Sequence, residues 1–235
     1  MPYSLLTMLQ QENQQIVQQF SSVPPTPQFE YVINENGAIA TLHRGWLESN
    51  YAKQLCTHLS LHTPWYTGKT VHNYPMPRAQ YVMSDANIKQ FKYSVIKLPV
   101  DGWQKDVGDI KDWISQDPII TSIVGYPVVC DSCLLNCYRN SQDFVDYHSD
   151  KIDKKVSDIV ITVSLGDSRI FSFKSKTKTQ NGGKNYEYRN RMLHNGDMMI
   201  MAGSCQDNWT HSILKEKELK DSYRISLTYR RVGPT

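Results

Sequence analysis

The spacing of hydrophobic residues changes along the chain and predicts helices in the first half and strands in the second. Apolar residues recur at helical spacing in residues 46–62 and in 107–116, so each segment is predicted to form a helix with one buried face. The predicted buried positions are Leu47, Tyr51, Leu55 and Leu59 in the first helix, and Val107, Ile110, Trp113 and Ile114 in the second. Upstream of both, β-type residues flank Asn36-Gly37, a pair typical of a tight hairpin turn.

From residue 128 onward, β-branched and aromatic residues fill short segments that turn residues separate. These segments are VVCDSCLLNCYR, DIVITVSLG, SRIFSFKS, YEYRNRMLH, DMMIMAG and SYRISLTYRR, with a loop or hairpin tip predicted at Lys174–Gly183. Short strands of this kind, with helices packed outside, predict a sandwich or open barrel. The predicted fold class is therefore α+β, and mainly β.

Length and composition fit one globular domain with a modest extension. The chain has 235 residues, and a hydrophobic share of 40% is enough for a real core. Residues 1–30 are interpreted as an extension and linker, with a short helix predicted at Leu5–Phe20 before the proline cluster of SSVPPTPQ. Residues 31–127 are expected to hold the helices, and 128–235 the barrel core.

The cysteines and the apolar runs indicate the compartment. Five cysteines are an odd number, which argues against a disulfide framework and for a reducing environment. Cys130, Cys133 and Cys137 leave a zinc-dependent module as an alternative. No apolar run is long enough to cross a bilayer, and the first residues lack a secretory pattern. We expect an intracellular monomer, cytoplasmic or nuclear, with no membrane partner.

The charge of the chain permits a nucleic-acid partner without indicating one, because the formal net charge is only +3. The clustering of lysines in two segments is a stronger indication of a nucleic-acid partner than the net charge. A solvated loop that lysines keep soluble explains the same clustering equally well. The clustered lysines are Lys151, Lys154, Lys155, Lys174, Lys176, Lys178 and Lys184.

Candidate chemistry lies in the strand-rich half. His148 and Asp150 form an HxD motif, His211 follows, and Arg224 and Arg230 stand at the two ends of RISLTYR. Two imidazoles and one carboxylate can bind one face of an octahedral iron and leave three positions open. We expect His148 and Asp150 to face the same side of one strand, because side chains alternate along a strand. An HxD motif alone is weak evidence, and the two arginines make the set specific.

The last strand predicts how those arginines act. A cation among apolar strand residues needs a partner, and a bidentate guanidinium at Arg224 suits the distal carboxylate of a diacid. Alternation places Arg224, Ser226, Thr228 and Arg230 on one face of this strand, opposite Ile225, Leu227 and Tyr229.

With these residues in place, the chain resembles the AlkB family of Fe(II)- and 2-oxoglutarate-dependent dioxygenases, which dealkylate nucleic acids. The resemblance covers roughly residues 42–232. The matching runs are NCY at 136–138, HSD at 148–150, VSLGDSRIFSF at 163–173, NGDMMIMAG at 195–203, WTHSI at 209–213 and RISLTYR at 224–230. Upstream, Pro77-Arg78 and FKYS at 91–94 resemble the family's nucleotide-recognition lid more loosely.

The resemblance implies a double-stranded β-helix, or jelly-roll, barrel and a role for each matching residue. Fe(II) would be bound by His148, Asp150 and His211; 2-oxoglutarate by Asn136, Tyr138 and Arg224; Ser226 would lie beside its pocket; and Arg230 would brace the proximal carboxylate end or the iron-bound aspartate. The candidate substrate contacts are Trp65, Arg78, Tyr81, Tyr93 and Asp153. The chain departs from the family in having serine for asparagine at 226, and in placing its nearest acid after the HxD at Asp153.

The implied activity is oxidative demethylation of N-alkylated bases in DNA or RNA with O2, which releases succinate, CO2 and formaldehyde. The base must come from a single strand or be flipped out of a duplex. Two alternatives stay open at this point. The same chemistry can act on a protein side chain or a small metabolite, and a barrel that has lost turnover can serve as a binding module.

Overall fold

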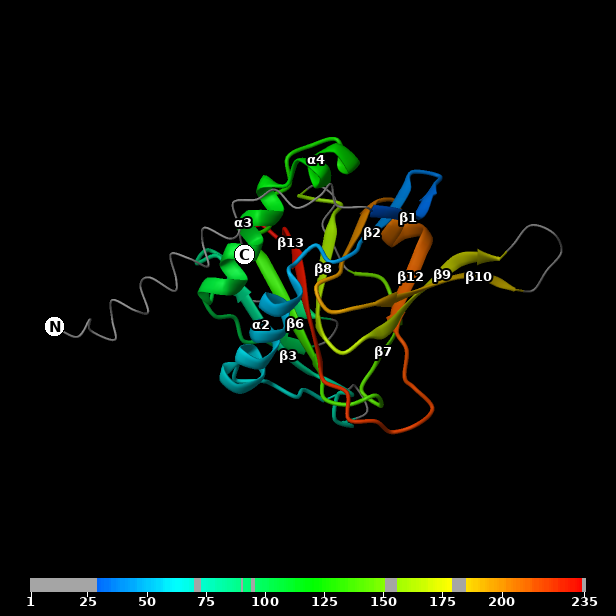
Figure 1. Ribbon diagram of the computed structural model, residues 1–235. Helices are drawn as coiled ribbons and strands as arrows, with labels where there is room; N and C mark the ends of the chain where they lie inside the picture. The colour runs from blue at the N-terminus through cyan, green and yellow to red at the C-terminus, as the bar shows by residue number, and fades with distance from the viewer. Residues whose placement is uncertain are drawn as a thin grey trace.

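Two antiparallel sheets form the body of the computed structural model, which describes residues 29–69, 73–89, 91–93, 96–150, 156–178 and 185–233 (Figure 1). The seven-stranded major sheet has the order β1 (Phe29–Glu35), β2 (Ala38–His43), β11 (Met198–Gly203), β8 (Val160–Gly166), β13 (Arg224–Arg230), β6 (Ser132–Tyr138), β3 (Ala79–Ser84). The four-stranded minor sheet has the order β10 (Tyr186–Leu193), β9 (Arg169–Lys178), β12 (Trp209–Ile213), β7 (Val145–His148). A separate pair joins β4 (Phe91–Tyr93) to β5 (Ile96–Leu98).

From β6 onward the chain passes back and forth between the two sheets. Strands β6, β8, β11 and β13 belong to the major sheet, and strands β7, β9, β10 and β12 belong to the minor sheet. Residues far apart in the sequence therefore meet between the sheets. This arrangement confirms the predicted mainly β, double-stranded β-helix fold.

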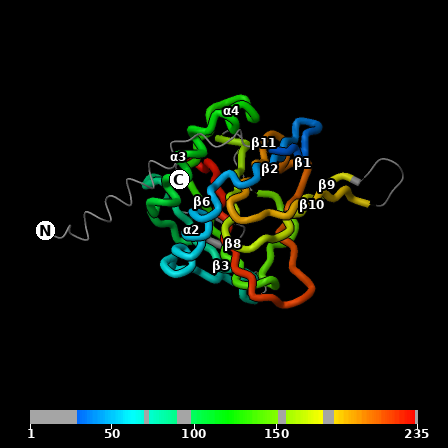
Figure 2. The backbone as a smooth tube through the Cα atoms, in the orientation of Figure 1, coloured from blue at the N-terminus to red at the C-terminus, as the bar shows by residue number. Residues whose placement is uncertain are grey.

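Both predicted helices are present, as α2 (Ser49–His62) and α3 (Lys105–Gln116). They lie on the side of the molecule away from the β9–β10 hairpin, and a third helix, α4 (Pro118–Val124), lies at the top of the view (Figures 1 and 2). The predicted burial of Trp113 is wrong, because its side chain is 41% exposed and packs against the Tyr51 ring at a centroid distance of 5.8 Å.

Two hydrophobic layers hold the fold together. The first lies between the helices and the major sheet and includes Leu55, Ile110, Leu135 and Leu227. The second lies between the two sheets and consists of Val32, Leu42, Phe171, Phe173, Trp209 and their neighbours. Strands β6, β8 and β11 contribute to both layers because their side chains alternate between the two faces of the major sheet.

The Asn36-Gly37 turn forms as predicted. Both residues have positive φ, 50° and 74°, which is what a two-residue hairpin turn needs between β1 and β2. Strand β2 then pairs with β11, and β3 pairs with β6. Strands from before and after residue 128 thus share the major sheet. The division of the chain into residues 1–30, 31–127 and 128–235 stays a prediction.

Three further differences from the sequence-based expectations concern local elements. Helix α4 is not among the predicted helices; Asp117 caps it by accepting hydrogen bonds from the amides of Ile119 and Ile120. Strand β9 continues to Lys178, which pairs with Tyr186, so the loop expected from Lys174 is wrong over that part. The helix expected at Leu5–Phe20 lies outside the described residues.

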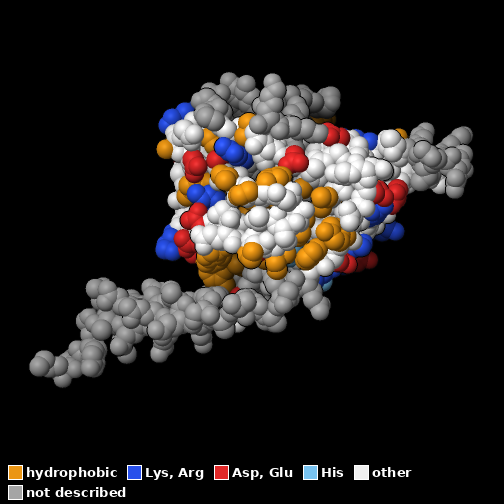
Figure 3. Space-filling view, turned by 90° about the horizontal axis from the view of Figure 1, so that it is seen from above, with side chains coloured by type: hydrophobic (Ala, Val, Ile, Leu, Met, Phe, Trp, Pro, Cys, Tyr) orange, Lys and Arg blue, Asp and Glu red, His pale blue; other side chains and the backbone are white. Residues whose placement is uncertain are grey.

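The surface carries charges of both signs. On the face drawn in Figure 3, acidic and basic side chains are interspersed among hydrophobic ones, so no single charge dominates it. Arg189 of β10 links the edges of the two sheets by donating to the Val32 carbonyl at 2.9 Å and pairing with Glu35 at 3.0 Å. In the described part of the chain, no helix has the length and apolarity needed to span a membrane.

Candidate active site

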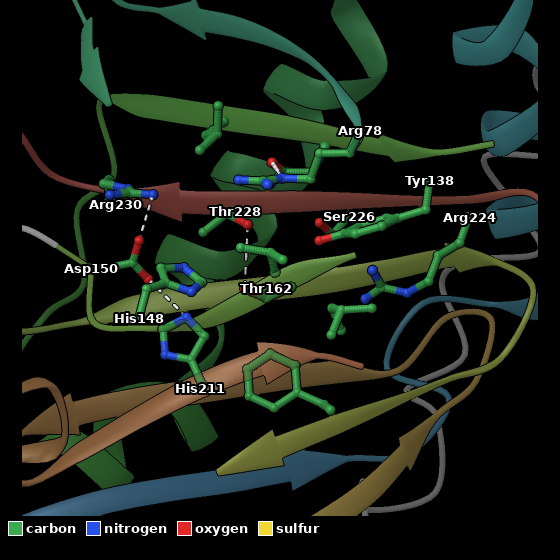
Figure 4. A pocket seen from close by; sticks show the side chains of 15 residues that line it. Arg78, Tyr138, His148, Asp150, Thr162, His211, Arg224, Ser226, Thr228 and Arg230 are labelled. Atoms are coloured by element: carbon green, nitrogen blue, oxygen red, sulfur yellow. Dashed lines mark hydrogen bonds and ion pairs between the residues drawn. The ribbon is translucent and has the colours of Figure 1, made fainter. Parts of the chain in front are cut away.

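A pocket opens between the two sheets, and strand β13 lines it along its length (Figure 4). Arg224, Ser226, Thr228 and Arg230 face this pocket, whereas Ile225 and its alternating neighbours face the helices. The alternation predicted for this strand is therefore present. Six residues of an extended strand span ~20 Å, so the two arginines mark opposite ends of the lined wall.

His148, Asp150 and His211 converge at one end of the pocket. Their ligand atoms all lie within 4.8 Å of one another. His148 ends β7 and is paired across the sheet with His211 of β12, with the two ring centroids 4.4 Å apart. Asp150 does not share a strand with His148 as expected, because β7 ends at His148. A two-histidine, one-carboxylate set of this kind suits Fe(II).

Hydrogen bonds beyond the end of β7 hold Asp150 in position. The Asp150 amide donates to Oε1 of Gln206 at 2.9 Å, and the Ser149 hydroxyl donates to the Trp209 carbonyl at 3.0 Å. Gln206 lies on α5 (Cys205–Asn208), immediately before β12. Sequence reasoning does not identify Gln206, although its place shortly before WTHSI is an available signal.

Charges around Asp150 keep it ionised. Arg230 Nη2 lies 3.0 Å from Asp150 Oδ1, and His211 Nε2 lies 3.4 Å from Oδ2. Burial alone would raise the pKa of Asp150, but Arg230 and the two imidazoles outweigh it and hold this pKa well below its usual range. The contact favours the second of the two roles expected for Arg230, the brace on the aspartate.

His148 is neutral and fixed in one tautomer. Its Nδ1 lies 2.8 Å from the Asp146 carbonyl, which can only accept, so Nδ1 carries the proton and Nε2 presents its lone pair. Burial, reinforced by His211, lowers the pKa of His148 to about 4. A neutral imidazole with a fixed second nitrogen is the form that binds a metal.

Arg224 lies at the other end of the pocket, as Figure 4 shows. Its side chain is fully buried, and Nε donates to the Ser164 hydroxyl at 3.0 Å. Among the described residues, neither Nη1 nor Nη2 has a hydrogen-bond partner. Burial lowers the pKa of Arg224 to about 10, so the guanidinium stays charged at neutral pH. A buried cation with two open donors fits a carboxylate ligand.

Two residues of β6 line the pocket from the neighbouring strand, Tyr138 opposite Arg224 and Asn136 opposite Ser226. The Tyr138 ring packs against Arg224, 5.2 Å from ring centroid to guanidinium carbon. Oδ1 of Asn136 accepts from Arg78 Nε at 2.8 Å and from Gln80 Nε2 at 3.0 Å. These two donors orient the Asn136 amide. Ser226 lines the pocket beside it, as expected.

Arg169 is a second fully buried arginine, and sequence reasoning misses it. Its Nη2 donates to the carbonyls of Asp143 at 2.9 Å and Leu214 at 2.5 Å, and its Nε lies 3.4 Å from Glu216. It therefore ties two loops together behind Tyr138. The available signal is its alternation with Phe171 in SRIFSF, which turns both side chains inward.

The candidate substrate contacts separate into three groups. Arg78 lines the pocket. Tyr81 and Trp65 do not line it and pack instead on the helix side of the major sheet, so their role as substrate contacts stays a prediction. The Tyr81 ring points there because its cross-strand partner, Leu135, faces the same layer. Asp153 and the Tyr93 side chain lie outside the described part of the chain.

The cysteines do not support a zinc module. All five are free and buried, and burial raises the pKa of Cys130 to about 12. The iron-type triad is the one group of three or more metal-binding side chains among the described residues, so Cys130, Cys133 and Cys137 do not form such a group there.

Comparison with known proteins gives a consistent picture. The model of the 2OG-Fe(II) oxygenase superfamily matches residues 40–230. Alpha-ketoglutarate-dependent dioxygenase alkB homolog 3 of Bos taurus is 36% identical over 44% of this chain and 37% of its own length. The Homo sapiens protein of that name is 27% identical over 82% of this chain and 66% of its own. DNA oxidative demethylase ALKBH2 of Arabidopsis thaliana is 26% identical over 74% of this chain and 60% of its own length. The matches thus span less than two thirds of these relatives, at 37%, 66% and 60%.

Proposed function

Since the chain belongs to the 2OG-Fe(II) oxygenase superfamily and, with its AlkB-homologue relatives, to the AlkB family, we propose that it demethylates N-alkylated bases in DNA or RNA. The observation that carries the proposal is the pairing of two sites in one pocket. A His-Asp-His triad stands at one end, and the open guanidinium of Arg224 at the other. A metal and a dicarboxylate bound together would occupy both.

Each residue of the pocket has a definite task in this proposal. His148, Asp150 and His211 hold Fe(II), and Arg224 holds the distal carboxylate of 2-oxoglutarate. When bound, Fe(II) with 2-oxoglutarate and O2 supplies the oxidation that converts an N-methyl group into formaldehyde, while 2-oxoglutarate becomes succinate and CO2.

The surrounding residues prepare the pocket for these ligands. Arg230 keeps Asp150 ionised, and the Asp146 carbonyl keeps the proton of His148 on Nδ1. Asn136 and Tyr138 complete the wall that faces the cosubstrate, with Ser226 beside them. The apolar side chains of Val145, Phe171 and Ile213 line the same space and limit the water that enters it.

The substrate is an exposed base rather than a paired one. A base within a duplex cannot reach a site between two sheets, so the strand must be single or the base flipped out. The relatives named as AlkB homologues and as a DNA oxidative demethylase support a nucleic-acid substrate. The five free cysteines support an intracellular setting, cytoplasmic or nuclear.

The test is anaerobic loading of the full chain with Fe(II) and 2-oxoglutarate, followed by O2 and a panel of methylated single-stranded DNA and RNA. We expect loss of the methyl mass from at least one strand, with one succinate formed per methyl removed. His148→Ala and Asp150→Ala should abolish succinate formation while the circular dichroism spectrum stays unchanged. Turnover coupled only to a protein or a small metabolite would overturn the substrate class, and retained turnover in both variants would overturn the metal assignment.

A further inference from the structure

The outer face of the minor sheet carries a cluster of three tyrosines around one lysine. Lys174 Nζ lies 4.2 Å from the ring centroid of Tyr186, 5.6 Å from that of Tyr147 and 5.9 Å from that of Tyr188. Tyr147 and Tyr188 meet edge to face, with centroids 6.0 Å apart. We call these four side chains the tyrosine platform. None of them lines the pocket.

Strand pairing explains why the platform faces outward. Lys174 pairs across the sheet with Tyr188 on one side and with Thr210 on the other. One residue along these strands, Phe173 of β9 pairs with His211 of β12. Both of these side chains face the space between the two sheets. The same sheet therefore presents the metal-binding histidines on its inner face and the platform on its outer face.

The platform is held in place by hydrogen bonds and is open to solvent. The Tyr147 hydroxyl is 2.6 Å from the Ser172 hydroxyl, which donates to Asn190 Oδ1 at 2.5 Å. Tyr188 nevertheless stays 51% exposed. Helices α2 and α3 lie on the opposite side of the molecule, and the β9–β10 hairpin reaches out from the body (Figures 1 and 2).

We propose that the tyrosine platform binds the nucleotides that flank the target base in a single strand of nucleic acid. This inference rests on the proposed demethylase function and extends it to a surface outside the pocket. Bases stack on tyrosine rings without regard to sequence, and a lysine among the rings supplies a charge for the phosphates between them. Lys176, two residues along the same strand, is exposed and adds a second positive charge, with its Nζ donating to the Gln206 carbonyl at 2.8 Å.

The path from the pocket to the platform is short. Strand β7 is the edge of the minor sheet, and it carries Tyr147 and His148 next to each other. A strand whose target base enters the pocket beside His148 passes over this edge to reach the outer face. Tyr147 is then the first ring it meets, with Tyr188 and Tyr186 beyond. The platform thus selects for strand length, not for the methylated base itself.

The experiment compares two substrates of different length in the loaded enzyme. One is a methylated trinucleotide, and the other is a methylated single strand of about fifteen nucleotides. The longer strand can reach from the pocket, over the β7 edge, to the outer face of the minor sheet. For Tyr188→Ala we expect kcat/KM to fall about tenfold on the long strand and to stay at the wild-type value on the trinucleotide. Lys174→Gln should weaken binding of the long strand and make its affinity less sensitive to salt, because one phosphate contact is lost.

The matched control is Tyr31→Ala. Tyr31 is also a strand tyrosine, 48% exposed, but its ring packs edge-on against Phe29 of β1 and not against the platform. This variant should match the wild type on both substrates. Thermal midpoints and uncoupled 2-oxoglutarate turnover of all variants check that the fold and the pocket are intact.

The outcomes separate this inference from the proposed function. If the wild type demethylates the long strand and Tyr188→Ala and Lys174→Gln do so equally well, the platform inference fails and the proposed function stands. An equal loss on the trinucleotide also overturns the inference, because it places the defect in the pocket. If the wild type neither binds nor demethylates any strand, both fail. Binding of acidic peptides in place of strands would assign the surface to a protein partner and overturn the inference as well.

Discussion

Arg230 of β13 forms an ion pair with Asp150, Nη2 to Oδ1 at 3.0 Å, and so joins the last strand of the major sheet to the metal-binding end of the pocket. Both side chains are buried, so the pair is shielded from solvent. The pair fixes where the carboxylate points and keeps it charged. The metal affinity of the site therefore depends on a residue that is not itself a ligand.

Removing Arg230 should weaken metal binding. For Arg230→Ala we expect the dissociation constant of Mn(II), used as a redox-stable stand-in for Fe(II), to rise by about 10- to 100-fold, because Asp150 loses its orienting partner. Titration followed by electron paramagnetic resonance measures this. Arg231→Ala removes the exposed neighbouring arginine and should leave the constant unchanged. Equal affinity in Arg230→Ala and the wild type would show that the pair does not support the metal site.

Removing Arg224 should act on the cosubstrate alone. For Arg224→Ala we expect the KM for 2-oxoglutarate to rise about 100-fold, since loss of one partner of a buried charge pair costs about 3 kcal/mol. Arg224→Lys should recover only part of this loss, because lysine cannot bind both carboxylate oxygens in parallel. Mn(II) affinity in the absence of 2-oxoglutarate serves as the internal reference. An unchanged KM would refute the carboxylate clamp.

His43 should make the stability of the apoprotein depend on pH. Burial lowers its pKa to about 4 from 6.5, so the unfolded chain binds the proton first as the pH falls. Stability contributed by the neutral form is present above about pH 6.5 and is lost progressively down to about pH 4, by about 3 kcal/mol in total. Urea denaturation across this range should show a shallower pH dependence for His43→Gln than for the wild type. His58→Gln, on the exposed side of α2, should keep the wild-type slope.

Gly166 should tolerate no side chain. Its φ is +83°, and a Cβ there would lie 2.3 Å from the Tyr223 carbonyl oxygen. We expect Gly166→Ala to lower the free energy of unfolding by about 2 to 4 kcal/mol, through both backbone strain and this clash. Gly102 gives the matched control, because a Cβ on this residue would meet no atom within 4 Å. Gly102→Ala should change the free energy by less than about 0.5 kcal/mol, and an equally small change at Gly166 would contradict the argument.

Sequence patterns predict the elements whose side chains alternate or recur without interruption. RISLTYR alternates cleanly, so the pocket face of β13 can be assigned from its residues alone. Helix α4 cannot be assigned in this way, because PIITSIV is short and rich in β-branched residues that favour strands. Its cap at Asp117 and the left-handed Gly125 that ends it are the local signals available.

Side-chain direction at strand ends is harder to predict than strand position. The HxD pattern suggests that Asp150 continues β7, but the strand ends at His148 and the Gln206 side chain holds the chain beyond it. Tyr81 is expected in the substrate site, yet one step of register on β3 decides whether a side chain faces the pocket or the helices. Neither the end of a strand nor its register follows from composition, because both depend on partners distant in the chain.

The passage of the chain back and forth between the two sheets also bears on how the protein folds. His148 and His211 become neighbours only when β7 pairs with β12, and β8, β9, β10 and β11 lie between these two strands in the chain. Contacts between residues so far apart in the sequence form slowly, because the chain loses the entropy of closing a long loop before strand pairing stabilises it. A chain in which β7 and β12 have not paired holds the two imidazoles apart, so tight metal binding during refolding reports the formation of this long-range pair.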